Sequence, residues 1–301
     1  MKQTVLVTGA SGFIGAHLAQ RLEQAGYRVR AMTRRPERYT GPGEPVAGDV
    51  SDPSSLARAL TDTDAAYYLV HSLSHDDFEA RDAQAARNFA AAAAEAEVGQ
   101  IIYLGGLGVD GEQLSSHLRS RREVETILSA GSVPVTTLRA AVIIGAGGIS
   151  WEITRQLVDH LPAMVLPAWA DTLTQPIALH DALTYLTGVL DNPAAIGRVF
   201  EIGGPEVLSY ADMLHRVARL EGRELPAVTT SLLTTQLTSL FLPLVTDVDT
   251  AVARTLVDSL STEVIVHDHS IQQVVPGPTM TFDEAARDAL ANRNADPYSV
   301  Q

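Results

Sequence analysis

Three glycines follow the first apolar run of the chain, at positions 9, 12 and 15. Residues 4–7 form that run, which has the character of a strand covered on both faces. Gly9 lets the backbone turn sharply, Gly12 lets it approach a diphosphate, and Gly15 lets the next helix pack closely. The positive end of that helix favours a negatively charged group. The segment therefore predicts a strand, a turn that holds a diphosphate, and a helix.

The first half of the chain alternates short apolar runs with helical patterns, which is typical of parallel strands joined by crossover helices. Further strands are expected at residues 27–32, 45–47, 65–70, 100–104 and 135–143. Helices are expected from Phe13 to near Gly26 and at residues 53–60, 76–97 and 116–130. Together with the glycine turn, this order predicts an α/β fold, a Rossmann doubly wound parallel sheet.

After Gly145 the regular alternation ends. A helix at 151–161 is followed by a strand, a helix and a strand at 175–178, 181–190 and 198–202. From Pro205 onward the pattern is mainly helical. We expect a dinucleotide-binding domain at residues 1–145, to which residues 175–204 return. Residues 146–174 and 205–301 should form a smaller, mainly helical C-terminal substrate lobe.

Two arginines decide between the nicotinamide cofactors. At the end of the second strand an NAD site usually carries an acid that accepts from the ribose 2′-hydroxyl. This chain has Thr33, Arg34 and Arg35 there. Arginines suit a 2′-phosphate because they form charge-assisted hydrogen bonds, although a solvated basic loop is the alternative. The sequence therefore predicts NADP(H) as the cofactor.

The remaining cofactor candidates lie at the same edge of the predicted sheet. Asp49 can accept from the adenine amino group or cap the next helix, a role for which Asp52 competes. The fourth strand ends in His71 and Ser72, where the cofactor ribose passes in such sheets. The full predicted cofactor set is Gly9, Ser11, Gly12, Phe13, Ile14, Gly15, Thr33, Arg34, Arg35, Asp49, Val50, His71 and Gly105.

The formal net charge of −14 repels phosphate backbones and anionic lipid surfaces. The chain contains no cysteine, and His267 and His269 have no evident third partner for a metal ion. No apolar run reaches the roughly 18 residues that span a bilayer, and the first residues lack a signal-peptide pattern. We expect a cytoplasmic protein, a monomer or homodimer, that acts on a small molecule and binds no nucleic acid, membrane or metal.

Further motifs stand at residues 48–50, 103–107, 138–145, 175–177, 181 and 200–205. With the glycine turn, they resemble the atypical short-chain dehydrogenase/reductases, in the branch of the NmrA-like and complex I accessory-subunit-like proteins. The resemblance covers most of the chain, weakens after about residue 226, and implies a nicotinamide cofactor and reductase activity. The family's usual set is a serine after the fifth strand and a Tyr-x-x-x-Lys pair on the next helix. Here Gly105 and Gly106 occupy the serine region, and Lys2 is the only lysine.

The resemblance places His117 where the family tyrosine stands and Arg121 where the lysine stands. Positions i and i+4 share one helical face. Arg121 would hold the nicotinamide ribose hydroxyls as a fixed cation. Its charge should lower the pKa of His117 and leave a neutral imidazole that still donates one hydrogen bond. The alternative is an exposed helix on which Arg121 and Glu125 form a solvated ion pair.

Serines at the end of the fourth strand provide the third catalytic candidate, Ser72, and a substrate candidate, Ser74. Ligands of open α/β sheets bind at this edge, although such hydroxyls often cap the following helix. A phenolic ketone can also satisfy its alkoxide through an internal hydrogen bond, which leaves the protein to position the hydride donor. The other substrate candidates are Gly106, Trp151, Trp169 and Gln175. Aromatic groups suit a large, flat ligand, and ordinary core packing is the alternative.

Taken together, these residues predict an NADPH-dependent ketoreductase that acts on a ketone of a large, aromatic polyketide-type substrate. The resemblance suggests the polyketide ketoreductases of antibiotic pathways. The alternative is a non-catalytic NADP(H)-binding sensor or assembly protein, which the missing tyrosine and lysine favour.

Overall fold

A parallel sheet of seven strands forms the centre of the chain, whose computed structural model describes residues 3–73, 75–108, 114–160, 163–230, 256 and 258–293. The strand order is β11-β6-β5-β4-β1-β2-β3, and each neighbouring pair is parallel. The strands are β1 (Thr4–Thr8), β2 (Arg28–Thr33), β3 (Glu44–Ala47), β4 (Ala65–Tyr68), β5 (Gln100–Gly106), β6 (Val135–Ala140) and β11 (Val199–Ile202). The predicted α/β fold of the Rossmann type is confirmed.

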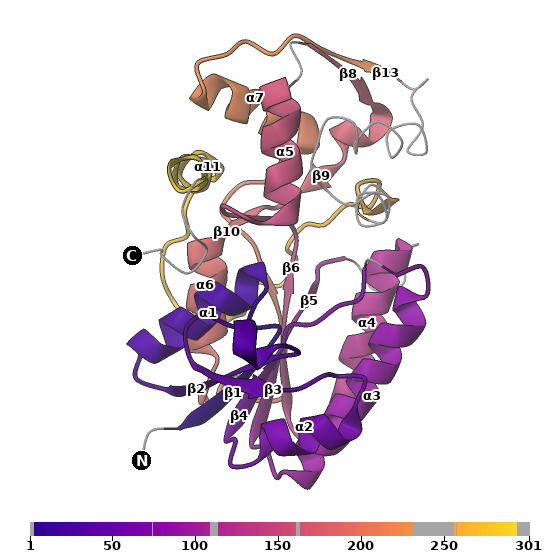
Figure 1. Cartoon of the computed structure of the whole chain (residues 1–301). Coiled ribbons are helices and arrows are strands. Elements are labelled where there is room, and N and C mark those ends of the chain that lie inside the picture. The colour runs from indigo at the N-terminus through magenta and orange to yellow at the C-terminus, as the bar shows by residue number, and fades with distance from the viewer. Residues whose placement is uncertain are drawn as a thin grey trace.

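Helices cover both faces of this sheet (Figure 1). The helices of one face are α1 (Phe13–Gln24) and α6 (Leu179–Gly188), and those of the other are α2 (Pro53–Leu60), α3 (Phe78–Glu95) and α4 (Ser116–Ser129). Every residue of β1 and of β4 is buried, because both strands lie between the two helical layers. This double cover explains why their sequences show no alternation of polar and apolar residues.

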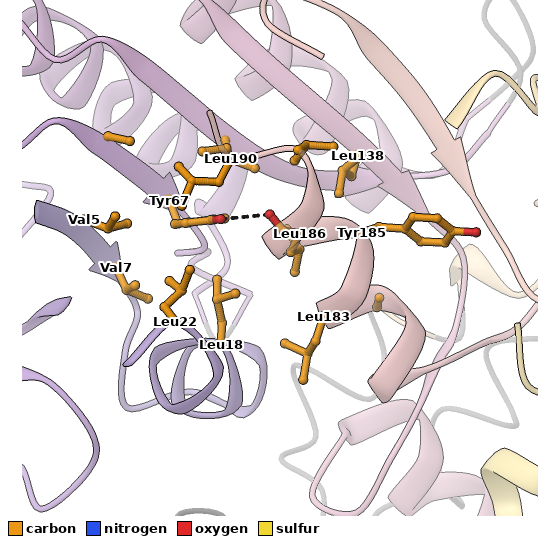
Figure 2. Packing of buried hydrophobic residues seen from close by; sticks show 14 of the residues in the cluster. Val5, Val7, Leu18, Leu22, Tyr67, Leu138, Leu183, Tyr185, Leu186 and Leu190 are labelled. Atoms are coloured by element: carbon orange, nitrogen blue, oxygen red, sulfur yellow. Dashed lines mark hydrogen bonds between the residues drawn. The ribbon is translucent and has the colours of Figure 1, made fainter. Parts of the chain in front are cut away.

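The core between the sheet and the layer of α1 and α6 is shown in Figure 2. Leu18 and Leu22 of α1 pack against strand residues, and Tyr67 of β4 reaches between the helices. The Tyr67 hydroxyl donates to the carbonyl oxygen of Leu186 on α6 at 2.8 Å. This buried hydrogen bond satisfies a phenol that would otherwise be costly to bury and ties α6 to the sheet.

The second half of the chain adds a smaller group of elements beyond the carboxyl ends of β5 and β6 (Figure 1). Its helices are α5 (Ile149–His160), α7 (Tyr210–Leu220) and α11 (Phe282–Ala291), with a 3-10 turn η2 (Ala168–Asp171). The short helix α10 (Ile271–Val274) packs instead against β11 of the main sheet. The strands of the smaller group are β7 (Ile143–Ile144), β8 (Met164–Pro167), β9 (Leu173–Thr174), β10 (Ile177–Ala178), β12 (Leu208–Ser209) and β13 (Ala227–Thr230). A separate apolar core, in which Trp151 is fully buried, joins α5, α7 and α11.

Three two-stranded sheets in this half depart from the mainly helical lobe that the sequence predicts. They pair β7 with β10, β9 with β12, and β8 with β13. Strands of two to four residues are too short to establish a period of two in the sequence. The expected strand over 135–143 is divided for a related reason, since β6 ends at Ala140 and the chain leaves the main sheet before β7.

No helix within the described ranges combines the length and the apolar character that crossing a membrane requires.

The glycine turn lies where the strand order reverses, between β1 and β4. Gly9 has a φ of +64°, which side-chain-bearing residues rarely adopt, and its carbonyl oxygen accepts from the Gly12 amide at 2.9 Å. A Cβ at position 15 would lie 2.2 Å from that same carbonyl oxygen. Helix α1 therefore packs on the turn only when residue 15 has no side chain.

We expect Gly15→Ala to lower the free energy of unfolding by about 2–3 kcal/mol, because the added methyl group forces the helix away from the turn. Urea unfolding followed by circular dichroism measures the change. The control is Gly26→Asn at the other end of α1, where a Cβ meets nothing within 4 Å and asparagine tolerates the positive φ of +93°. Equal unfolding midpoints for wild type and Gly15→Ala would contradict the steric argument.

Candidate functional site

The turn at residues 9–15 has the features of a diphosphate cradle. Gly12 is the N-cap of α1 and has no side chain with which to cap the helix. The first amide groups of a helix have no partners within it, so those at the start of α1 remain available to an anion. Ser11 and Gly12 are exposed, which leaves the outer side of the turn open. The residues present therefore fit the diphosphate of a dinucleotide.

The ring of Phe13 is committed to packing rather than to a ligand. A Cβ at Gly148 would lie 2.8 Å from its Cε1 atom, and a Cβ at Gly145 would lie 3.0 Å from its Cζ atom. The ring thus rests directly against the backbone of the turn that precedes α5. Ile14 packs half-buried against the core under α1. Cofactor contacts from these two residues are therefore expected from their backbone amides.

The second strand ends in the predicted phosphate-binding segment. The Thr33 hydroxyl accepts from the Arg35 amide at 3.3 Å, which bends the chain after β2. Arg34 and Arg35 are both exposed. Among the residues that the structure describes, neither guanidinium has an ion pair or a hydrogen bond. Both cations are thus available to an anionic group at this end of the site.

Asp49 and Val50 follow β3 at the same edge and are half-buried. One carboxylate oxygen of Asp49 accepts from the amide of Ser51 at 2.8 Å and from its hydroxyl at 2.7 Å. The N-cap of α2 is Asp52, whose side chain accepts from the Ser54 amide. The alternative in which Asp49 caps this helix is therefore wrong, because Asp52 holds that position.

The end of β4 supplies His71 and Ser72, whereas Ser74 lies outside the described residues. The N-cap position of α3 is held by Asp77, and the helix begins at Phe78 rather than at the expected residue 76. Ser72 is half-buried and its carbonyl oxygen accepts from the His75 amide at 3.0 Å. Ser72 thus belongs to a turn between β4 and α3 and does not cap the helix.

A buried ion pair joins α3 to α4 beside the carboxyl end of β5. Arg121 is 7% exposed and its Nη2 contacts Oδ2 of Asp82, which is 2% exposed. The Ser120 hydroxyl donates to the same carboxylate oxygen at 3.3 Å, and the Tyr103 hydroxyl donates to the Arg121 carbonyl at 3.0 Å. Within the described residues, Nε of Arg121 is buried without a hydrogen-bond partner.

His117 and His71 share the electrostatic environment of this ion pair. Burial, the Arg121 cation and His71 lower the pKa of His117 to about 3. The protein around His71 and the same cation lower the pKa of His71, which nevertheless keeps an exposed surface. The predicted direction for His117 is confirmed, although burial contributes more than the cation. Both imidazoles are therefore neutral near pH 7.

The alternative of a solvated Arg121–Glu125 pair on an exposed helix is wrong. Arg121 pairs with Asp82, and Glu125 is 8% exposed. Glu125 instead accepts from Arg139 of β6 through both of its carboxylate oxygens, at 2.6 and 3.0 Å. This helical face of α4 is therefore turned toward the sheet and toward α3, where each charge has its own partner.

The predicted substrate residues are not gathered at one place. Trp151 is fully buried in the core of the second half, as the core-packing alternative expects. Trp169 is partly buried and makes an edge contact with Tyr210, at 6.0 Å between ring centroids. Gln175 bridges two loops through its side chain. Its Nε2 donates to the Gly204 carbonyl at 2.7 Å, and its Oε1 accepts from the Val266 amide at 3.0 Å.

The two glycines that end β5 lie against the ion-pair region. A Cβ at Gly106 would lie 2.8 Å from Leu118 and 3.5 Å from Cγ of Arg121, so the start of α4 packs directly on this strand end. Gly105 is buried, and a Cβ there would lie 3.0 Å from the Tyr103 ring. Of the two, Gly106 is therefore the nearer to the polar cluster on α4.

A segment from the end of the chain also packs against the start of α4. Val264 and Val266 form a small apolar cluster with Leu107 and Leu118. The hydroxyls of Ser115 and Ser259 are hydrogen-bonded at 2.9 Å. The second half of the chain thus contacts the helix that carries His117, immediately beside the polar cluster.

Asp82 and Tyr103 are the site residues that sequence reasoning missed. A usable signal existed for Asp82, because it lies on the helical stripe of Phe78, Ala85, Ala86 and Phe89, which is otherwise apolar. A charge on such a stripe indicates a buried partner. Tyr103 lies in a fully buried part of β5 and gives no comparable signal. No group of three or more metal-ligating side chains occurs among the described residues.

Comparison with known proteins agrees with this geometry. A family model described as NAD(P)H-binding matches residues 9–162. The (4-alkanoyl-5-oxo-2,5-dihydrofuran-3-yl)methyl phosphate reductase of Streptomyces griseus is 29% identical over 225 residues, 73% of this chain and 75% of that protein. The mitochondrial NADH dehydrogenase (ubiquinone) 1 alpha subcomplex subunit 9 of Arabidopsis thaliana is 24% identical over 221 residues, 69% of this chain and 55% of that protein.

The crystal structure of the Citrobacter sp. triphenylmethane reductase complexed with NADP(H) has the same fold. Its TM-score is 0.77 at 15% identity, with 95% of this chain and 99% of that chain covered. The NAD(P)H-binding family model includes the glycine turn, the end of β4 and the polar cluster on α4. The motifs of the chain resemble those of the atypical short-chain dehydrogenase/reductases, and the chain belongs to the NAD(P)H-binding family.

Proposed function

We propose that the chain is an NADPH-dependent reductase that acts on a ketone of a large, aromatic polyketide-type molecule. One observation carries the proposal: the polar cluster of His117, Arg121 and Asp82 lies at the same sheet edge as the open glycine turn. A dinucleotide that extends from the turn along this edge reaches that cluster. The name of the Streptomyces griseus relative, a reductase, supports the reaction class.

The preference for NADPH rests on Arg34 and Arg35. The two exposed guanidinium groups follow β2, where the adenine ribose of a dinucleotide is held in this fold. A 2′-phosphate there would form ion pairs as well as hydrogen bonds with the two cations, whereas the neutral 2′-hydroxyl of NADH would form no ion pair. The triphenylmethane reductase of Citrobacter sp., whose crystal structure holds NADP(H), supports this preference.

In the proposed reaction, the carbonyl carbon would receive the hydride that NADPH supplies when it is bound at the glycine turn. His117 is neutral and donates a hydrogen bond to the carbonyl oxygen, which stabilises the alkoxide until it takes a proton from water. Arg121 holds the nicotinamide ribose as a fixed cation, and Ser72 orients the carbonyl group. A phenolic hydroxyl beside the ketone would add an internal hydrogen bond to the same oxygen.

The substrate is placed between the dinucleotide domain, residues 1–145, and the lobe formed by residues 146–174 and 205–301. The contact of Ser259 with Ser115 supports this placement, because it brings the lobe to the helix of His117. Gly106 provides a strand end without a side chain beside the cluster. Trp169 is the side chain of the lobe that we propose to meet the ligand.

A second function follows from the missing tyrosine and lysine. In this alternative the chain binds NADP(H) without turnover and serves as a sensor or an assembly protein. The Arabidopsis thaliana relative named as a NADH dehydrogenase subunit supports it. The half-buried, neutral imidazole at position 117 favours the reductase, because a binding protein has no need for a donor at the site of hydride transfer.

The test is turnover by the purified protein with NADPH and a panel of aromatic and aliphatic ketones, followed at the nicotinamide absorbance band. Oxidation with phenolic aromatic ketones and none with small aliphatic ones is the expected result. Micromolar binding of NADPH without oxidation in any assay would support the sensor instead. Absence of NADPH binding would contradict both functions.

Replacement of Arg34 and Arg35 by alanine should raise the Kd for NADPH at least roughly tenfold and leave the Kd for NADH within about twofold. The reason is that NADPH carries a 2′-phosphate to pair with the two cations, whereas NADH carries no charged group at that position. Isothermal titration calorimetry measures both constants. The control is Arg287→Ala, an exposed arginine on α11. Equal losses for the two cofactors would refute the phosphate assignment.

Replacement of His117 by phenylalanine should lower kcat by at least about tenfold, because the substrate oxygen loses its donor. Since the pKa of His117 lies at about 3, the imidazole stays neutral above that value. The kcat of the wild type should therefore show no inflection near the ordinary imidazole value of about 6.5. His215→Phe, a half-buried histidine on α7, is the matched control. A rate that falls as the pH rises through neutrality would mean that a protonated imidazole acts.

A further inference from the structure

The buried carboxylate of Asp82 is the strongest unexplained feature near the proposed site. It lies on the apolar stripe of α3, is 2% exposed, and pairs with the almost equally buried Arg121. Removing two charges from water costs free energy that their attraction often fails to restore. A buried ion pair is therefore weak evidence that the two residues are there to stabilise the fold, so the presence of this pair needs another explanation.

The partners of Arg121 show what the ion pair fixes. Asp82 engages Nη2, and the aliphatic part of the arginine lies against Gly106 at the end of β5. The Ser120 hydroxyl holds the carboxylate from the neighbouring position of α4. A guanidinium is a rigid planar fork, so one fixed nitrogen constrains the plane of the others. Asp82 thus sets the direction of a cation that would otherwise rotate on a flexible stem.

The same pair balances the charge around the two histidines. Arg121 lowers the pKa of both His71 and His117, whereas Asp82 raises the pKa of His71. The two tyrosines that face the pair are Tyr68 and Tyr103, and their pKa values respond to both charges. Removing Asp82 would leave an uncompensated cation beside both imidazoles.

We propose that Asp82 is a positioning residue of the cofactor site: its ion pair fixes the Arg121 guanidinium beside the end of β5, in the orientation that holds the nicotinamide ribose. The proposal rests on the proposed function for the role of Arg121. It requires that Asp82 affects NADPH binding without touching the cofactor itself.

The experiment compares Asp82→Asn with Glu125→Gln in the full-length protein. Each variant removes one buried carboxylate charge. Asp82 pairs with Arg121, whereas Glu125 pairs with Arg139 of β6 and with Arg122 of α4. Asp82→Asn should raise the Kd for NADPH roughly tenfold, and Glu125→Gln should leave it within about twofold. Similar changes in both variants would overturn the proposal, because they would reflect loss of packing alone.

A second readout is independent of binding and turnover. Nuclear magnetic resonance titration of the imidazoles should show a lower pKa for His71 in Asp82→Asn than in the wild type, because the charge that raises it is gone. It should show no change in Glu125→Gln. An unchanged His71 pKa in Asp82→Asn would mean that the charge of Asp82 does not reach the site, and it would overturn the proposal.

Should Asp82→Asn fail to fold, Asp82→Glu decides the question. It keeps the charge and the ion pair, but its longer side chain displaces the guanidinium, so the Kd for NADPH should rise at a temperature at which circular dichroism shows that the variant is folded. An unchanged Kd would overturn the proposal. These binding measurements do not require turnover, so absence of ketone reduction by the wild type would refute the reductase and leave the test of Asp82 intact.

Discussion

The approach of α1 to its own preceding turn is the constraint on which the rest of the fold depends. The carbonyl oxygen of Gly9 occupies the space that a Cβ of residue 15 would need, and it also accepts from the Gly12 amide. The helix is therefore seated on the end of β1, with its amide groups directed over the point where the strand order reverses. Strand order, helix direction and anion site are fixed together at this one contact.

Beyond this turn, the site is built from charges that the protein has removed from water. Arg121 and Glu125 lie on the same buried face of α4, where their pairs with Asp82 and with Arg139 anchor the helix to α3 and to β6. The imidazole of His117 lies beside the first of these pairs. Helix α4, which carries His117 and Arg121 in place of the usual tyrosine and lysine, is thus held more rigidly than its polar sequence indicates.

The dinucleotide half of the fold was predictable because its signals are local and repeated. The glycine turn, the unbroken apolar strands and the alanine-rich α3 each depend on a few neighbouring residues. The short paired strands of the second half were not predictable, because β9 and β12 form their hydrogen bonds with each other, across more than thirty residues of sequence. Trp151 and Gln175 resembled ligand contacts in sequence, yet the one fills a core and the other bridges loops. The Asp82–Arg121 pair joins two helices whose relative placement no local pattern records.

The contact of Phe13 with the turn before α5 has a consequence for anyone who redesigns this chain. Its ring touches bare backbone at both Gly145 and Gly148, with no side chain between them to yield. A side chain at either glycine would displace the ring of the same residue whose amide directly follows the N-cap at the start of α1. Loop grafts that begin after Gly148 leave this contact as it is.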